Sequence, residues 1–94
     1  KVPAAQAQRM GMVYQVFPEE DYEGEVAALA LRMAQMPTKG LALTKRALNA
    51  AATNDLNTQL DLEEALQTKA GKTYDFNEGV QAFLEKRAPD FKGE

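Results

Sequence analysis

The last twenty residues read Asp75-Phe-Asn-Glu-Gly-Val-Gln-Ala-Phe-Leu-Glu-Lys-Arg-Ala-Pro-Asp-Phe-Lys-Gly-Glu94 and carry the strongest pattern in the chain. Asp75 and Glu78 have the spacing of a capping box, with Asp75 as N-cap and Glu78 three residues on. The apolar side of the predicted helix is then formed by Phe76, Val80, Phe83 and Leu84. Lys86 and Arg87 complement the helix dipole at its end, and Pro89 terminates the segment.

Helical patterns continue toward the N-terminus, and their limits are marked by prolines, glycines and capping residues. We expect a helix from Leu56 to Ala70, with Thr53-Asn54-Asp55 as turn and cap and Gly71 as its C′ residue. Its predicted inner face is Leu56, Leu60, Leu62 and Leu66. Before it, Thr38 is predicted to cap a helix whose inner face is formed by Leu41, Thr44, Leu48 and Ala51.

Two further helices are predicted closer to the N-terminus. Tyr22, Val26, Leu29 and Met33 form one stripe of a helix that starts after the acidic Glu19-Glu20-Asp21 and ends at Met36-Pro37. Pro3 begins a short helix, Ala4 to Met10, which Gly11 ends in a left-handed conformation. Between the two, Met12 to Phe17 is predicted to be a lone short strand, which needs a neighbouring strand from elsewhere.

Composition excludes several classes of site and partner. The 94 residues include no Cys and no His, so a thiolate nucleophile, a Ser-His-Asp relay, a disulfide and a conventional zinc site are impossible. A formal net charge of −3 without a basic stripe argues against a protein that binds nucleic acid. No apolar run is long enough to span a membrane and no signal peptide is visible, so we expect a cytoplasmic protein.

Carboxylates are the remaining candidates for acid–base chemistry, and their spacing is unfavourable. Glu63 and Glu64 are neighbours in sequence and point about 100° apart on a helix. Glu19, Glu20 and Asp21 are explained by the dipole at a helix start. The scattered glycines do not form a phosphate loop. We therefore predict no catalytic residues, no metal and no cofactor in this chain.

The C-terminal pattern resembles the end of the crotonase (enoyl-CoA hydratase/isomerase) superfamily: an acidic residue, Glu-Gly, Ala-Phe, Lys-Arg, Pro and a final Phe. Ala4 to Pro18 is similar to that family's Ala-x-x-x-Gly-Leu-Val-x-x-Val-x-Pro segment. Met36-Pro37 with Leu43 to Asn49 is similar to its next helix. Together these matches cover nearly the whole chain in the family's order.

A finer resemblance extends from Thr53 to Glu63 and continues through Gln67, Ala70-Gly71-Lys72 and Asp75. It is similar to the subfamily of 2-(1,2-epoxy-1,2-dihydrophenyl)acetyl-CoA isomerases, which convert a ring epoxide to an oxepin in phenylacetate degradation. The fold this implies is mainly α: the C-terminal helical, trimerisation segment of a crotonase, with about five short helices and one strand. Residues 1–17 would end the core and residues 18–94 would form the helical association domain.

The resemblance implies that the catalytic acids and the oxyanion hole lie in an N-terminal ββα core that these 94 residues do not contain. A chain that begins with Lys1 fits a piece of a longer protein. The segment would mediate trimer or hexamer contacts, cover the site of the CoA thioester substrate, and be inactive alone. In several crotonases a Phe-x-x-Lys pair in the last helix contacts the adenine end of CoA, and here it matches Phe83 and Lys86.

For both members of this pair, the sequence also allows a purely structural role. Phe83 lies on the apolar stripe with Val80 and could be a core residue, and Lys86 could be only a last-turn cation. For the whole protein, the alternative in the same class is a fatty-acid enoyl-CoA hydratase. The alternative in another class is a stand-alone helical self-association module without a ligand, which could dimerise through its Ala- and Leu-rich stripes.

Overall fold

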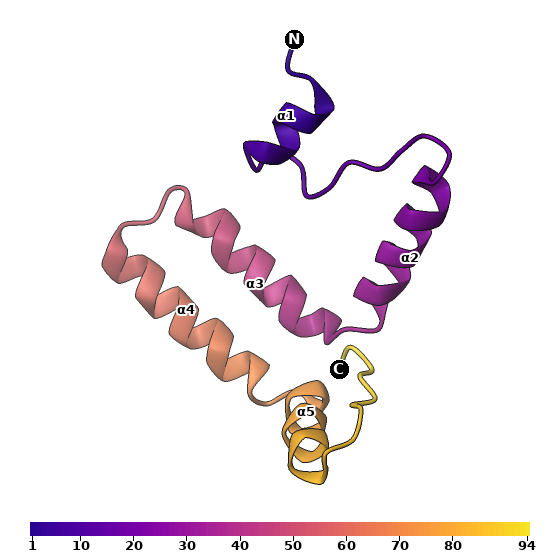
Figure 1. Ribbon diagram of the computed structural model, residues 1–94. Helices are drawn as coiled ribbons and strands as arrows, with labels where there is room; N and C mark the ends of the chain where they lie inside the picture. The colour runs from indigo at the N-terminus through magenta and orange to yellow at the C-terminus, as the bar shows by residue number, and fades with distance from the viewer. The chain divides into compact units, whose positions relative to one another are not determined.

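The computed structural model describes residues 1–94 and consists of five helices without a strand (Figure 1). The helices are α1 (Ala4–Arg9), α2 (Tyr22–Ala34), α3 (Thr38–Ala51), α4 (Leu56–Ala70) and α5 (Tyr74–Glu85). The chain forms two compact units, Lys1–Leu31 and Arg32–Glu94. The mainly helical fold class is therefore confirmed, whereas the predicted strand is wrong.

In the first unit, α1 ends as its sequence predicts. Gly11 has φ +73°, the left-handed conformation that closes a Schellman motif, in which the Met12 amide donates to the carbonyl of Ala7 at 2.9 Å. Residues 12–17 then form turns and irregular backbone. The Val16 amide donates to Oε1 of Gln8 at 2.7 Å, so a side chain of α1 takes the bond that a neighbouring strand would otherwise accept.

The second helix, α2, agrees with its predicted limits at both ends. Glu23 and Glu25 occupy its first turn, and it stops before Met36-Pro37. Of the predicted stripe, Leu29 is half-buried, whereas Tyr22, Val26 and Met33 are exposed. The amphipathic pattern of α2 therefore predicts the helix correctly. Its apolar stripe, however, is mostly not covered by other residues of this chain.

In the second unit, α3 and α4 form an antiparallel helical hairpin (Figure 1). The half-buried face of α3 is formed by Gly40, Leu43, Ala47 and Ala50, together with Leu41. The predicted inner face was wrong for Thr44, Leu48 and Ala51, and Leu48 is 69% exposed. Leu43 and Leu41 are the large apolar side chains of this face, and Ala47 and Ala50 are its small ones. Thr38 is the first helical residue, after Pro37 at the N-cap, and makes no cap bond.

The predicted limits of α4 are correct, and so is its cap: Oδ1 of Asp55 accepts from the Thr58 amide at 2.9 Å. On its predicted inner face Leu66 is buried and Leu62 half-buried, but Leu56 and Leu60 are exposed. The side chain of Gln59 fixes the hairpin by donating from Nε2 to the carbonyl of Ala47 at 3.1 Å. The prediction that Gly71 is the C′ residue of α4 is wrong, because Gly71 is the C-cap itself and is right-handed, with φ −64°.

The last helix, α5, is not capped by Asp75. Thr73 is its N-cap, and Oγ1 of Thr73 accepts from the Phe76 amide at 3.1 Å. The predicted capping box is therefore wrong, because Asp75 and Glu78 lie within the helix and bind the segment that follows it. The predicted apolar side is exposed at every position: Phe76, Val80, Phe83 and Leu84.

Candidate functional site

The predicted pair Phe83 and Lys86 lies at the C-terminal end of α5. The side chain of Phe83 is 82% exposed, so the structure does not bury it in a core. Lys86 follows the last helical residue and has φ +55°, the one positive φ at a residue other than glycine. Its side chain is exposed and makes no ion pair within 4 Å. Both side chains are thus free to contact a ligand.

The end of α5 forms a Schellman motif around Lys86. The Arg87 amide donates to the carbonyl of Ala82 at 3.0 Å, and the Lys86 amide donates to that of Phe83 at 3.3 Å. Glycine is the usual residue at the left-handed position of this motif, because a Cβ atom is unfavourable there. The lysine at this position therefore has a cost in backbone energy.

An apolar groove of about 450 Å³ lies beside Phe83. One side is formed by the exposed apolar residues of α5, and Phe91 from the C-terminal segment contributes another part of the wall. The complete lining is Pro37, Gly40, Ala70, Thr73, Asp75, Phe76, Gly79, Val80, Phe83, Leu84 and Phe91. A groove with this lining can accept an apolar or aromatic group.

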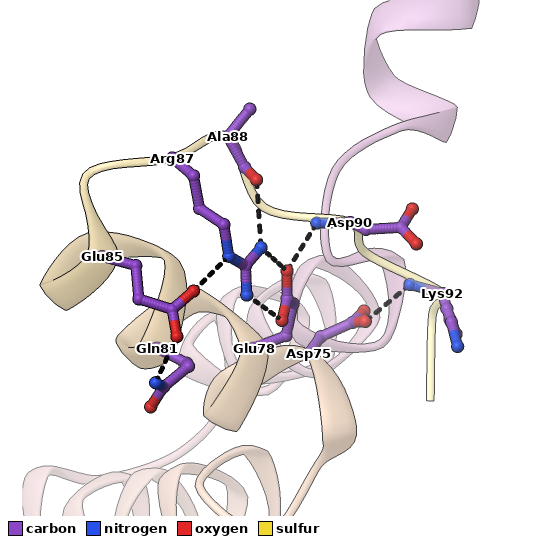
Figure 2. A network of polar contacts seen from close by, with 8 residues as sticks. All are labelled: Asp75, Glu78, Gln81, Glu85, Arg87, Ala88, Asp90 and Lys92. Atoms are coloured by element: carbon purple, nitrogen blue, oxygen red, sulfur yellow. Dashed lines mark hydrogen bonds and ion pairs between the residues drawn. The ribbon is translucent and has the colours of Figure 1, made fainter.

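An adjoining side of α5 holds the C-terminal strap, which we define as residues 87–94. The stripe of α5 that faces it is Asp75, Glu78, Gly79 and Ala82, at helical spacing i, i+3, i+4 and i+7. Asp75 is 2% exposed and Ala82 is 1% exposed. Figure 2 shows the carboxylates of this stripe directed toward the strap.

Glu78 is bound by the strap at two points. Its Oε1 and Oε2 accept from the Arg87 guanidinium at 2.6 and 2.9 Å, and Oε1 also accepts from the Asp90 amide at 2.8 Å (Figure 2). These hydrogen bonds from Arg87 and then from the Asp90 amide lower the pKa of Glu78 to about 2. The same carboxylate, followed by that of Glu85, raises the pKa of Arg87.

Asp75 binds the far end of the strap. Its Oδ1 accepts from the Lys92 amide at 2.7 Å and its Oδ2 from the Gly93 amide at 2.8 Å. Its own amide donates to the carbonyl of Glu94 at 3.1 Å. Sequence reasoning missed this role, because the local spacing of Asp75 and Glu78 also fits a capping box. The sequence signal for this role is a second stripe along α5, which is formed by small and acidic residues and differs from the apolar stripe.

Neither Arg87 nor Lys92 is an unpaired cation near Phe83. Arg87 is bound by Glu78 and also donates from Nε to Glu85 at 2.6 Å. The Nζ of Lys92 lies 4.7 Å from the ring centroid of Tyr74, a cation–π contact. Lys86 is therefore the cation at this end of α5 that keeps its charge available.

The remaining carboxylates do not form a catalytic arrangement. No group of three or more acidic side chains is placed to hold a metal ion. Glu63 accepts from Nε2 of Gln59 at 2.8 Å and lines a second groove, of about 400 Å³, between α3 and α4. Glu64 is exposed and does not line this groove.

No helix is both long and apolar enough to cross a membrane. This result concerns only the five helices described above.

Comparison with known proteins identifies the family pattern over the whole chain. The model of the enoyl-CoA hydratase/isomerase family matches residues 1–94. The 1,2-epoxyphenylacetyl-CoA isomerase of Escherichia coli is 47% identical over 93 residues, which are 99% of this chain and 36% of that protein. A probable enoyl-CoA hydratase of Rhodobacter capsulatus is 44% identical over 93 residues, again 99% of this chain and 36% of the relative.

Solved structures agree with the sequence comparison. The crystal structure of an enoyl-CoA hydratase from Geobacillus kaustophilus superimposes with a TM-score of 0.89 at 30% identity. The match covers 99% of this chain and 35% of that structure. The chain thus spans about a third of the length of the relatives that it matches.

Proposed function

The chain belongs to the enoyl-CoA hydratase/isomerase family, and from this premise we propose that it binds the adenine end of a CoA thioester through Phe83 and Lys86. The ring of Phe83 offers a stacking surface for adenine, and the ammonium group of Lys86 offers a charge to a phosphate. The neighbouring groove adds an apolar surface on the same side of α5.

The observation that carries this proposal is the pair itself: a phenylalanine 82% exposed beside a lysine in a left-handed backbone conformation. A large apolar side chain left in water and a backbone conformation unfavourable for lysine both oppose stability. Their occurrence at neighbouring positions is explained if both serve a ligand.

For the whole protein we propose isomerisation of a ring epoxide of a phenylacetyl-CoA derivative. The support is the 47% identity to the isomerase of Escherichia coli, which extends over 99% of this chain. A fatty-acid enoyl-CoA hydratase remains the second candidate, because the relative of 44% identity is named a probable enoyl-CoA hydratase. These 94 residues alone are proposed to be inactive, since they match only 36% of the length of that isomerase and the resemblance places the catalytic acids in its other part.

We also propose that the helices associate with other protein surfaces, as subunits of a trimer or hexamer. The support is the large number of exposed apolar side chains, because Leu66 and Ala82 are the only buried apolar residues. Contiguous exposed apolar surface is typical of protein interfaces. A stand-alone self-association module would share this property but would not need Phe83 and Lys86 as a pair.

Isothermal titration of the chain with coenzyme A tests the binding site. We expect Phe83→Ala to weaken binding roughly tenfold through lost stacking. Lys86→Gln, which removes the charge and keeps a shorter polar side chain, should weaken it up to about fivefold. Tyr22→Ala and Lys45→Gln remove an exposed aromatic ring and an exposed charge elsewhere and should not change it. Unaltered affinity in both Phe83 and Lys86 variants would refute the assignment.

The reaction is tested on the protein encoded by the complete gene, after its intact mass has been compared with that of the 94-residue chain. Turnover of ring-1,2-epoxyphenylacetyl-CoA, followed by the absorbance of the product, supports the isomerase. Turnover of crotonyl-CoA alone supports the hydratase instead. Turnover of neither substrate by a folded protein contradicts both.

A further inference from the structure

The C-terminal strap runs back along α5, and successive residues of the strap bind successive residues of the helix in reverse order. Near the helix end, the Arg87 amide binds the carbonyl of Ala82, and the Arg87 guanidinium binds Glu78. Nearer the helix start, the Lys92 and Gly93 amides bind Asp75. The strap is therefore held along the length of α5 by polar groups of a single helical stripe.

Between these polar contacts, Gly79 lies against the aromatic ring of Phe91. A Cβ atom at Gly79 would lie 3.5 Å from Cε1 of Phe91, which is ordinary van der Waals contact. A larger side chain has no room unless the ring moves. Since Phe91 is part of the groove wall, the position of the strap decides the shape of the groove beside Phe83.

The strap also acts on Lys86 at its other end. Left-handed backbone is unfavourable for a residue with a Cβ atom, so Lys86 keeps it only while neighbouring contacts hold the chain. The residue directly after it, Arg87, is held by Glu78 and Glu85. Release of Arg87 would allow Lys86 to leave this conformation.

We propose that Asp75 and Glu78 are positioning residues, which bind the strap and thereby hold Phe91 in the groove wall and Lys86 beside Phe83. The ligand part of this proposal rests on the proposed CoA site. Glu78 does not line the groove and acts through strap residues, whereas Asp75 binds the strap and also lines the groove. If loss of the Glu78 contacts leaves the strap bound for a tenth of the time, the affinity for coenzyme A falls about tenfold.

Two variants disturb the strap by unrelated means. Glu78→Ala removes the acceptor of Arg87 and of the Asp90 amide, whereas Glu78→Gln keeps one acceptor oxygen, which can still accept from both. Gly79→Ile places a stiff, branched side chain where the Phe91 ring lies, whereas Gly79→Ala fits the available space. Asp55→Ala removes the cap of α4 and serves as the control for general loss of stability.

The first measurement is the nuclear Overhauser contact between the ring protons of Phe91 and the α protons of Gly79 or its replacement. We expect it to disappear in Glu78→Ala and Gly79→Ile and to persist in Glu78→Gln, Gly79→Ala and Asp55→Ala. Its persistence in both disruptive variants would overturn the proposal, whether or not the chain binds coenzyme A.

The second measurement is the affinity for coenzyme A in the Glu78 and Asp55 variants. We expect about a tenfold loss in Glu78→Ala, and less than about a twofold change in Glu78→Gln and in Asp55→Ala. Because Gly79 itself lines the groove, its variants are compared only through the Phe91 contact. An equal loss in Asp55→Ala would show a general stability effect and overturn the positioning role. A wild-type chain that does not bind coenzyme A refutes the proposed function. The contact between Phe91 and Gly79 then tests, independently of binding, whether Asp75 and Glu78 hold the strap in place.

Discussion

Arg87 and Glu78, nine residues apart, form a bidentate ion pair in which the guanidinium donates to both carboxylate oxygens, at 2.6 and 2.9 Å. The pair joins the start of the C-terminal strap to the middle of α5 (Figure 2). Its geometry gives a structural reason for the recurring Glu-Gly, Ala-Phe and Lys-Arg elements of the C-terminal pattern. Glu78, Gly79, Ala82 and Arg87 are four of the residues with which helix and strap contact each other.

We predict that the chain loses stability as the pH falls from about 4.5 toward 2. The pKa of Glu78 is lowered from 4.5 to about 2 by the Arg87 and Asp90 hydrogen bonds, so the folded protein favours the ionised carboxylate. This contribution is fully present above the unfolded pKa and is lost as the pH falls through the folded one. Asp55 and Glu85, whose pKa values are also lowered, act in the same direction.

The measurement is the urea midpoint at pH 7 and at pH 3, for the wild type and for Glu78→Gln. Glu78→Gln should reduce the difference between the two pH values, because its side chain does not titrate. Glu64→Gln, at an exposed glutamate without an ion pair, is the matched control and should retain the difference. An equal pH dependence in wild type and Glu78→Gln would contradict the prediction.

Lys86→Gly should stabilise the chain by about 0.5–1 kcal/mol while weakening coenzyme A binding, because glycine accepts the left-handed conformation without a Cβ penalty. Thermal unfolding and titration with coenzyme A measure the two effects. If Lys86→Gly is more stable and binds coenzyme A with unchanged affinity, the side chain of Lys86 does not contribute to binding. Gly11→Ala adds a Cβ atom at φ +73° and should therefore be destabilising. It is the control which shows that a Cβ atom at a left-handed position lowers the stability of this chain.

Gly93→Ala and Gly24→Ala should change stability in opposite directions. Gly93 has φ +75°, and a Cβ there would lie 2.5 Å from Oγ1 of Thr38, so we expect a loss of about 1 kcal/mol or more. Gly24 lies inside α2 with open space around its Cβ position, so alanine should add about 0.5–1 kcal/mol. Urea unfolding of both variants checks the signs, and equal signs would be inconsistent with this geometry.

Asp55→Ala should cost about 1 kcal/mol, because it removes the acceptor of the Thr58 amide at the start of α4. Asp55→Asn should retain most of the stability, since asparagine is an equally good cap. Asp61→Ala removes an exposed aspartate from the same helix and should be neutral or slightly stabilising. Urea midpoints distinguish the cap from a general charge effect, which would affect both aspartates alike.

We expect the chain to self-associate as its concentration rises, through its exposed apolar side chains. Leu48 and Leu60 are exposed on α3 and α4, and Leu48→Asp with Leu60→Asp should shift the chain toward monomer. Sedimentation velocity over a range of concentrations measures the effect. Glu64→Asp with Lys45→Arg is the matched double control. A chain that is monomeric at every concentration tested would exclude this interface.

Local patterns in the sequence were sufficient for most helix limits. Asp55 before Leu56, Pro3 before Ala4 and Gly11 after α1 act through contacts within a few residues, so their effects are visible in the sequence. Periodicity also predicted that Phe76, Val80, Phe83 and Leu84 share a side of α5. It could not tell whether that side is covered, and in this chain it is exposed.

The sequence predictions were wrong where one local pattern allowed two interpretations, or where a contact between distant residues determined the structure. Asp75 and Glu78 have capping-box spacing, but Thr73 is the cap, and the two carboxylates bind strap residues up to 18 positions away. Residues 12–17 have the alternation of a strand but find no strand partner among these 94 residues. The composition and order of residues specified the helices, the family resemblance and the Phe83–Lys86 pair. Only folding in three dimensions decided which face of each helix is covered, because that depends on side chains far apart in the chain.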